Sequence, residues 1–168
     1  MRGEMHVTDD HIALASLYKG WDVYQQHLTR AIAPLSPEQL ALRAAPDLRS
    51  IGMIAAHIIG ARVRWFHRLM GEGSVDIHLL GIWDRPEAPA RSAAELVNGL
   101  EDSWQLIQSS LAHWTLADLE HVYEGTYEGE EYSLTRRWII WHVIEHDIHH
   151  GGEISLTLGI YGLEGLDL

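Results

Sequence analysis

Residues 141–153 read WHVIEHDIHHGGE, and four of these thirteen positions are histidine. Acidic and apolar residues stand between the histidines, and the apolar character continues back to residue 138. A purification tag would be an uninterrupted run at a terminus, whereas this segment is interior. We therefore interpret it as part of a folded helix.

The spacing of these histidines predicts a metal site on one helix face. Residues four apart on an α-helix are offset by only about 40°, so both side chains can reach one ion. His142 with His146 and His146 with His150 both have this spacing, and spacing alone does not choose between them. His149 lies on the same broad face. Burying several imidazoles without a metal or another partner would be costly, because each ring nitrogen needs a hydrogen-bond partner.

His57 is the candidate for a third ligand. Two histidines on one helix leave a zinc-like catalytic site one ligand short, since such sites use three protein ligands and an open position. His57 shares a helical stripe with Met53, Ile54 and Ala61, so we expect it to point into the fold. Standing alone it would be read as a core histidine bonded to a carbonyl. The Glu-x-x-His repeats of di-iron bundles and the HExxH motif of zinc proteases are both absent.

The rest of the chain predicts an all-α four-helix bundle, which we expect to form a single domain over residues 1–168. Four long helices are expected: from Thr8 or Asp9 to Ile32, from Ser50 to Met70, from Ser92 to Trp114, and from near Ser133 to Leu158. Residues 36–39 form a capping box that opens a short helix. Long connections over residues 72–91 and 115–133 allow a crossover topology. The first should lack long regular structure, and the second is expected to hold a small β-hairpin between residues 121 and 133.

Charge and composition exclude several classes of function. The formal charge of −12, from 24 acidic and 12 basic residues, opposes nucleic acid or an anionic membrane as the main partner. Only Arg62, Arg64 and Arg68 suggest a local basic patch. The chain has no cysteine, which excludes thiolate catalysis and restricts metal ligands to nitrogen and oxygen. The N-terminus has no secretory signal and the most apolar run covers only about half a membrane, so we expect a cytoplasmic protein.

Two segments resemble the DinB/YfiT-like superfamily. Residues 145–162, EHDIHHGGEISLTLGIYG, are similar to its final-helix signature, commonly NHxxHHRGQ followed by an apolar stretch and a glycine. Residues 50–73, SIGMIAAHIIGARVRWFHRLMGEG, are similar to its second helix, with one histidine followed by an aromatic residue. The resemblance covers nearly the whole chain and implies a metal-binding four-helix bundle. It places the three metal ligands on His57, His146 and His150, with His142 and His149 as neighbours.

The chain departs from the family signature at three positions. Glu145 stands where asparagine is usual, Gly151 where arginine is usual and Glu153 where glutamine is usual. Glu145 and Glu153 are candidates to orient a ligand or to move protons beside the site. Gly151 and Gly152 each weaken the helix by roughly 1 kcal/mol relative to alanine, a cost that a close helix crossing could offset.

The resemblance also implies a class of activity. Members with an assigned activity are similar to metal-dependent thiol transferases or isomerases that use mycothiol, bacillithiol or glutathione. Three neutral imidazoles leave a divalent ion its charge and an open position, where a thiol loses its proton and can attack an electrophile. Zinc or nickel is expected first, with iron or manganese as alternatives. A metal-binding stress-response protein without turnover and a metal-dependent hydrolase are the competing hypotheses. We expect a homodimer, because aromatic-rich bundles often bury a helix face between subunits.

Overall fold

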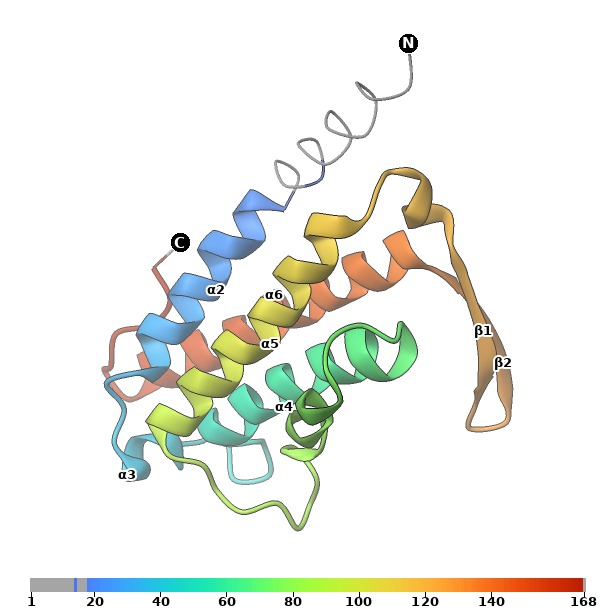
Figure 1. Cartoon of the computed structure of the whole chain (residues 1–168). Helices are drawn as coiled ribbons and strands as arrows, with labels where there is room; N and C mark the ends of the chain where they lie inside the picture. The colour runs from blue at the N-terminus through green and yellow to red at the C-terminus, as the bar shows by residue number, and fades with distance from the viewer. Residues whose placement is uncertain (1–13, 15–17, 168) are drawn as a thin grey trace.

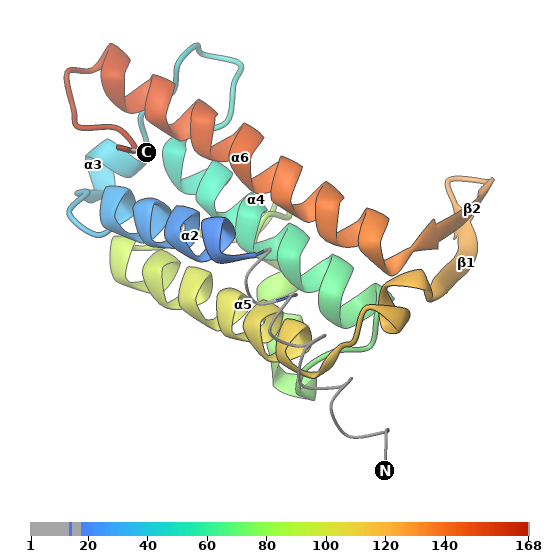
Figure 2. The same cartoon turned by 90° about the horizontal axis from the view of Figure 1, so that it is seen from above.

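The computed structural model describes residue 14 and residues 18–167, and its four long helices form a bundle (Figures 1 and 2). The helices are α2 (Lys19–Ile32), α4 (Ile51–Val63), α5 (Ala93–His113) and α6 (Arg136–Ile160). Helix α4 packs against α5 and α6, while α2 packs against the same two helices. The predicted all-α four-helix bundle is therefore confirmed. No helix in the described part of the chain is both long enough and apolar enough to span a membrane.

Side-chain caps fix where most of the helices begin. Capping boxes at Ser36 and Ser92 open the short helix α3 (Pro37–Leu40) and α5, as predicted. The Ser50 hydroxyl accepts a hydrogen bond from the Met53 amide at the start of α4. For the first long helix, the end at Ile32 agrees with the prediction, while the predicted start at residue 8 or 9 lies outside the described residues.

The predicted start of the last helix near Ser133 is wrong. Ser133 belongs to a strand and pairs with Glu124, and the hydroxyl of Thr135 caps α6 instead. At the other end, Gly159 does not stop the helix, which continues to Ile160 before the chain turns at Gly162 with φ of 70°. Glycine inside a helix costs only about 1 kcal/mol, and the buried Leu158 beside it favours continuation.

The long connection between α4 and α5 needs a correction, because it is not free of regular structure. Helix α4 passes into a π-helical turn, η1 (Arg64–Leu69), and the connection then contains a 3₁₀ helix, η2 (Val75–Ile82). Residues 75–82 are mostly apolar, and Ile77 and Leu80 pack against the buried core. Burial of these side chains explains why this segment is ordered against the bundle despite the prolines that follow it.

The predicted hairpin is present and projects from the bundle (Figure 1). Strand β1 (Val122–Tyr127) pairs antiparallel with β2 (Glu130–Thr135). The two residues between them, Glu128 and Gly129, have φ of 50° and 89°. Positive φ at both central positions is the geometry of the tight turns that match strand twist.

A buried polar network lies in the core where α2, α4 and α6 meet. Arg62 is fully buried, and its Nε and Nη2 donate to Asp147 Oδ2 at 2.9 and 2.8 Å. Arg62 Nη1 donates to Gln25 Oε1 at 2.7 Å, and Trp21 Nε1 also donates to Asp147, at 2.8 Å. The interpretation of Arg62 as part of a basic surface patch was therefore wrong. Removing one partner of such a buried pair typically costs about 3–5 kcal/mol, so the network strongly fixes how α2, α4 and α6 align.

Candidate metal centre

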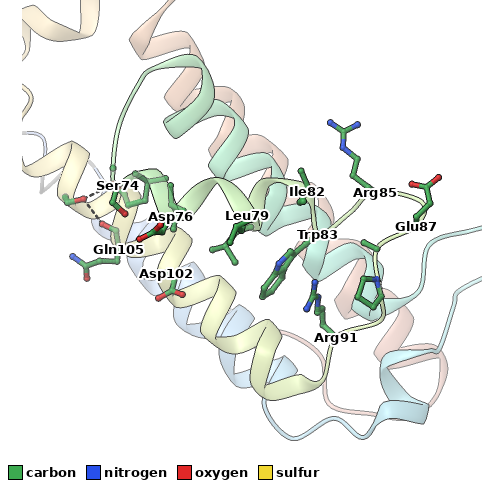
Figure 3. A pocket seen from close by; sticks show the side chains of 17 residues that line it. Ser74, Asp76, Leu79, Ile82, Trp83, Arg85, Glu87, Arg91, Asp102 and Gln105 are labelled. Atoms are coloured by element: carbon green, nitrogen blue, oxygen red, sulfur yellow. Dashed lines mark hydrogen bonds between the residues drawn. The ribbon is translucent and has the colours of Figure 1, made fainter.

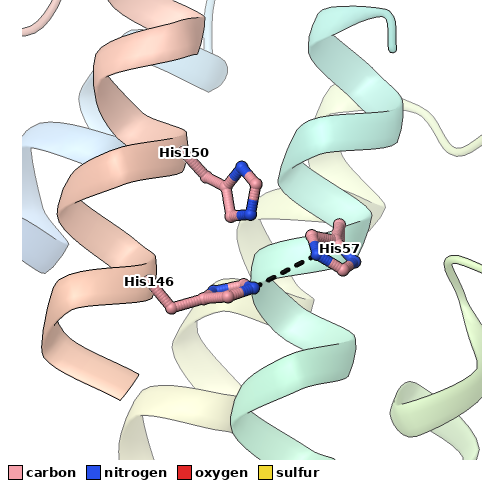
Figure 4. A group of neighbouring side chains, drawn as sticks. All are labelled: His57, His146 and His150. Atoms are coloured by element: carbon pink, nitrogen blue, oxygen red, sulfur yellow. Dashed lines mark hydrogen bonds between the residues drawn. The ribbon is translucent and has the colours of Figure 1, made fainter. Parts of the chain in front are cut away.

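The three predicted ligands meet at the contact between α4 and α6. His57 comes from α4, and His146 and His150 come from α6 (Figure 4). One ring nitrogen of each lies within 4.8 Å of the others, so the three side chains could hold one metal ion. His57 Nε2 and His146 Nε2 are 3.1 Å apart. Two nitrogens that share one tetrahedral zinc ion would lie about 3.3 Å apart, which is close to this spacing.

The buried network sets the direction in which the α6 histidines point. Asp147 is held in the core by Arg62, and it directly follows His146 along the helix. Neighbouring residues on a helix are offset by about 100°, so burying Asp147 turns His146 and His150 toward the border facing α4. The ion pair in the core therefore aims two of the three imidazoles.

The glycine that follows His150 permits a close approach of α2. A Cβ at Gly151 would overlap the Tyr24 hydroxyl, which donates a hydrogen bond to the carbonyl of Ile148 at 3.2 Å. The close helix crossing expected at the two glycines is thus present at Gly151. Gly152 faces open space instead.

Carboxylates contact the far nitrogens of two of the three imidazoles. His57 Nδ1 lies 2.7 Å from Asp84 Oδ2, and His150 Nδ1 lies 2.6 Å from Glu153 Oε2. A carboxylate can only accept, so each ring carries its hydrogen on Nδ1 and keeps a lone pair on Nε2. The third ring differs, because His146 Nδ1 is buried without a hydrogen-bond partner among the described residues. In all three rings the nitrogen available to a metal is Nε2.

Burial favours the neutral form of the His146 and His150 rings. It lowers the pKa of His146 to about 3, and the nearby His150 and His57 rings add to the shift. Burial also lowers the pKa of His150, although the hydrogen bond with Glu153 opposes this. For Asp84, burial works to raise the pKa, but hydrogen bonds from His57 and Arg64 outweigh it and hold the pKa below its usual value. Neutral imidazole is the form that binds a metal.

His142, His149 and Glu145 lie outside the group of three converging histidines. His142 stacks on Trp138 with ring centroids 5.1 Å apart and also contacts Trp65. His149 is exposed, with Nε2 3.7 Å from Glu153 Oε1. Glu145 is exposed on α6 and forms no hydrogen bond or ion pair within the described ranges. Of the two acidic candidates, only Glu153 contacts one of the three converging histidines.

The donor set fits a borderline divalent ion such as zinc or nickel. Three neutral nitrogens leave such an ion its full charge, and the partly exposed ring of His57 leaves one side of the site open to solvent. A cavity of about 1100 Å³ lies elsewhere, between η2, the segment that follows it and α5 (Figure 3). None of the three histidines lines it. Its wall includes Trp83, with the Arg91 guanidinium 4.6 Å from the ring centroid.

The contact of His57 with Asp84, and of Asp84 with Arg64, was not predicted. Asp84 lies in the segment predicted to be a loop, 27 positions from His57, so no helical spacing links the two. Arg64 was grouped with neighbouring arginines, yet its guanidinium binds Asp84 through two nitrogens at 2.7 and 2.8 Å. The only available signal was an isolated acidic residue after a tryptophan in a proline-rich segment, which does not indicate a partner.

Comparisons with known proteins agree with the sequence resemblance. A model of the DinB family matches residues 5–166. A crystal structure of a DinB-like protein from Bacillus cereus has a similar fold, with a TM-score of 0.68 and 21% identity over 89% of this chain and 93% of that chain. A conserved protein from Enterococcus faecalis has a TM-score of 0.60 and 16% identity, with 82% and 92% of the two chains covered. No curated protein matches. Because the family model spans nearly all of the sequence, the chain belongs to the DinB family.

Proposed function

We propose that this protein is a metal-dependent enzyme that transfers or isomerises a low-molecular-weight thiol adduct, with His57, His146 and His150 as the metal ligands. The convergence of three imidazoles at an accessible border of the bundle carries the proposal. Two of the three rings are already oriented by carboxylates, and burial lowers the pKa of His146 and His150. Zinc or nickel is proposed first, with iron or manganese as alternatives.

In this proposal the residues of the chain bind the metal ion and orient the imidazole rings that hold it. A divalent ion in the site supplies positive charge that lowers the pKa of a thiol bound to it. Neutral imidazoles hold the ion without cancelling that charge. Glu153 accepts the Nδ1 hydrogen of His150, which keeps that ring in the tautomer with a free Nε2. Its side chain is also exposed enough to pass a proton to solvent.

The sulfur must come from a co-substrate, because the chain contains no cysteine. We propose a small thiol such as bacillithiol, mycothiol or glutathione as this co-substrate, with an electrophile as the second substrate. The three classes of function make different demands on a bound ion. A transferase needs a thiol, a hydrolase needs water in the same position, and a binding protein needs neither.

The outer face of α6 supports a homodimer. Trp141 is 62% exposed, and Trp138, Ile148 and Leu156 are exposed along the same side of the helix. The opposite side of α6 lies in the core, so the helix carries large apolar side chains on both sides. Helices of this kind are normally covered on all sides. We infer that a second copy of the chain packs against this face.

The test begins with metal analysis of the untagged protein, followed by thermal shifts with bacillithiol, mycothiol and glutathione and with their disulfides. The transferase proposal predicts one tightly held ion, stabilisation by one thiol but not by its disulfide, and thiol-dependent turnover of a reporter electrophile. Ester or amide turnover without thiol would indicate a hydrolase. A bound ion with neither thiol binding nor turnover would indicate a metal-binding protein without catalysis.

A further inference from the structure

We propose that Asp84, clamped by Arg64, is a positioning residue that orients the His57 ring toward the metal. The inference rests on the metal site proposed above and adds Asp84, which lies outside the two histidine-bearing segments, together with its partner Arg64. It assigns a task to the segment after η2, which returns to the surface of α4 beside His57.

Both oxygens of Asp84 are engaged. Oδ1 accepts from Arg64 Nη1 at 2.7 Å, while Oδ2 accepts from Arg64 Nη2 at 2.8 Å and from His57 Nδ1 at 2.7 Å. Arg64 Nη1 also donates to the carbonyl of Gly81 at 2.9 Å, which ties the guanidinium to the end of η2. A two-pronged contact between guanidinium and carboxylate fixes both position and orientation. The carboxylate therefore reaches His57 from a fixed direction.

The direction of this contact selects the tautomer of His57. Because the carboxylate only accepts, the hydrogen of the neutral ring lies on Nδ1, and Nε2 presents its lone pair toward His146. Without Asp84, the neutral ring could carry its hydrogen on Nε2, which would block the metal-binding nitrogen. A carboxylate behind a ligating histidine fixes ring orientation and raises its basicity.

An independent feature of α4 makes room for this clamp. A Cβ at Gly60 would lie 2.8 Å from Arg64 Nη1 and 3.1 Å from Asp84 Oδ1. Glycine in a helix interior costs roughly 1 kcal/mol relative to alanine, yet here it leaves the helix surface open beside His57. The Asp84–Arg64 ion pair lies in the space that a side chain at Gly60 would need. The local sequence of α4 is therefore matched to the Asp84–Arg64 pair as well as to His57.

Asp84 is better fixed than the equivalent partner of His150. The Asp84 side chain is 12% exposed and held by Arg64, whereas the Glu153 side chain is 44% exposed and its nearest other partner is the exposed His149. Removing Asp84 should therefore release its imidazole more completely than removing Glu153. The proposal can therefore be tested by comparing the removal of Asp84 with the removal of Glu153 in the same protein.

Zinc titration of the metal-free protein against a chelating dye tests the proposal. Asp84→Ala is expected to weaken zinc binding by about 10- to 100-fold, and Glu153→Ala by less. Asp102→Ala is the matched control, since it removes the same charge from an exposed position on α5. Two-bond ¹H–¹⁵N spectra of the histidine rings give a second readout. His57 should be an Nδ1–H tautomer in the wild type and should gain Nε2–H character in Asp84→Ala.

The outcomes separate this inference from the proposed function. If His146→Ala abolishes zinc binding while Asp84→Ala binds zinc like Asp102→Ala and keeps the wild-type tautomer, the positioning role is overturned and the metal site stands. A wild-type protein that binds no zinc, although His57 is an Nδ1–H tautomer, contradicts the metal site itself. If Asp84→Ala does not fold, Gly60→Ala replaces it, because its methyl group displaces the ion pair. That variant should weaken zinc binding and alter the His57 tautomer, and wild-type values for both would overturn the inference.

Discussion

His146 is the residue on which the site depends most. Its Nε2 faces His57, and its ring centroid lies 4.3 Å from that of His150. Its Nδ1 is buried with no hydrogen-bond partner within the described residues, unlike the Nδ1 atoms of the other two rings. An unpaired polar group in such a position costs stability, so the fold bears a local cost to keep this ring in place.

The first prediction concerns the pH dependence of stability without metal. The folded-state pKa of His146, about 3, lies below the ordinary value of 6.5, so the unfolded state binds more protons between these values. The contribution of His146 to the free energy of unfolding is therefore fully present above about pH 6.5 and is lost as the pH decreases toward 3. From pH 7 to pH 5 we expect a loss of roughly 2 kcal/mol from this residue alone. The lowered pKa of His150 acts in the same direction.

Urea unfolding at pH 7 and pH 5, with a chelator present, measures this loss. His146→Gln removes the titrating group and should flatten the profile by about the same amount. An unchanged pH dependence in that variant would show that His146 is not the source.

The two adjacent glycines of α6 give the second prediction, at the scale of one helix. A methyl group at Gly151 would overlap the Tyr24 hydroxyl, so Gly151→Ala should destabilise the protein by about 1–3 kcal/mol. At Gly152 a Cβ would meet no neighbouring heavy atom of the described chain within 4 Å. Gly152→Ala should therefore stabilise it by about 0.5–1 kcal/mol through helix propensity.

Chemical denaturation of the two alanine variants measures whether Gly151→Ala is destabilised and Gly152→Ala is stabilised, as predicted. Tyr24→Phe removes the hydroxyl and should recover part of the loss in Gly151→Ala. Equal effects of the two alanines would mean that α2 and α6 do not approach as closely as described here.

At the level of helices and strands, the sequence correctly predicted the features that depend only on neighbouring residues. Both capping boxes formed, because the serine hydroxyl and the residue three positions later satisfy each other's backbone groups. The start of α6 was misplaced because Ser133 and Thr135 are both good caps, and strand pairing with β1 decides between them. The helix η2 was missed because its order comes from burial against α4 and α5, which sequence periodicity does not reveal.

The candidate site likewise contains residues that were predicted from the sequence and residues that were not. Helical spacing predicts two possible pairs on α6 and a helical stripe makes His57 the candidate third ligand, while the family resemblance selects His150 over His142. Asp84, Arg64 and Gly60 were not predicted, since their arrangement depends on where the segment after η2 returns to α4. The prediction for Arg62 was wrong because arginines in a helix are usually exposed, and its partner Asp147 is 85 residues away.

The third prediction concerns the assembly of whole molecules. The exposed apolar face of α6 should form the contact between two copies, so light scattering at micromolar concentration should give twice the 19.0 kDa of one chain. Trp141→Glu should shift the mass toward that of one chain, because a carboxylate would be buried in the contact. Tyr127→Glu on the exposed hairpin is the control and should leave the mass unchanged. A monomer mass for the wild type would refute the homodimer.

The central claim is that one divalent ion binds to His57, His146 and His150, and metal content tests it most directly. Untagged wild type and its single alanine variants would be loaded with zinc, desalted and analysed for zinc per chain. We predict one zinc per chain for the wild type, almost none for His146→Ala and His150→Ala, and most of the wild-type content for His142→Ala. If His142→Ala loses the zinc and His150→Ala retains it, the ligands are His142 and His146, and the site assigned here is wrong.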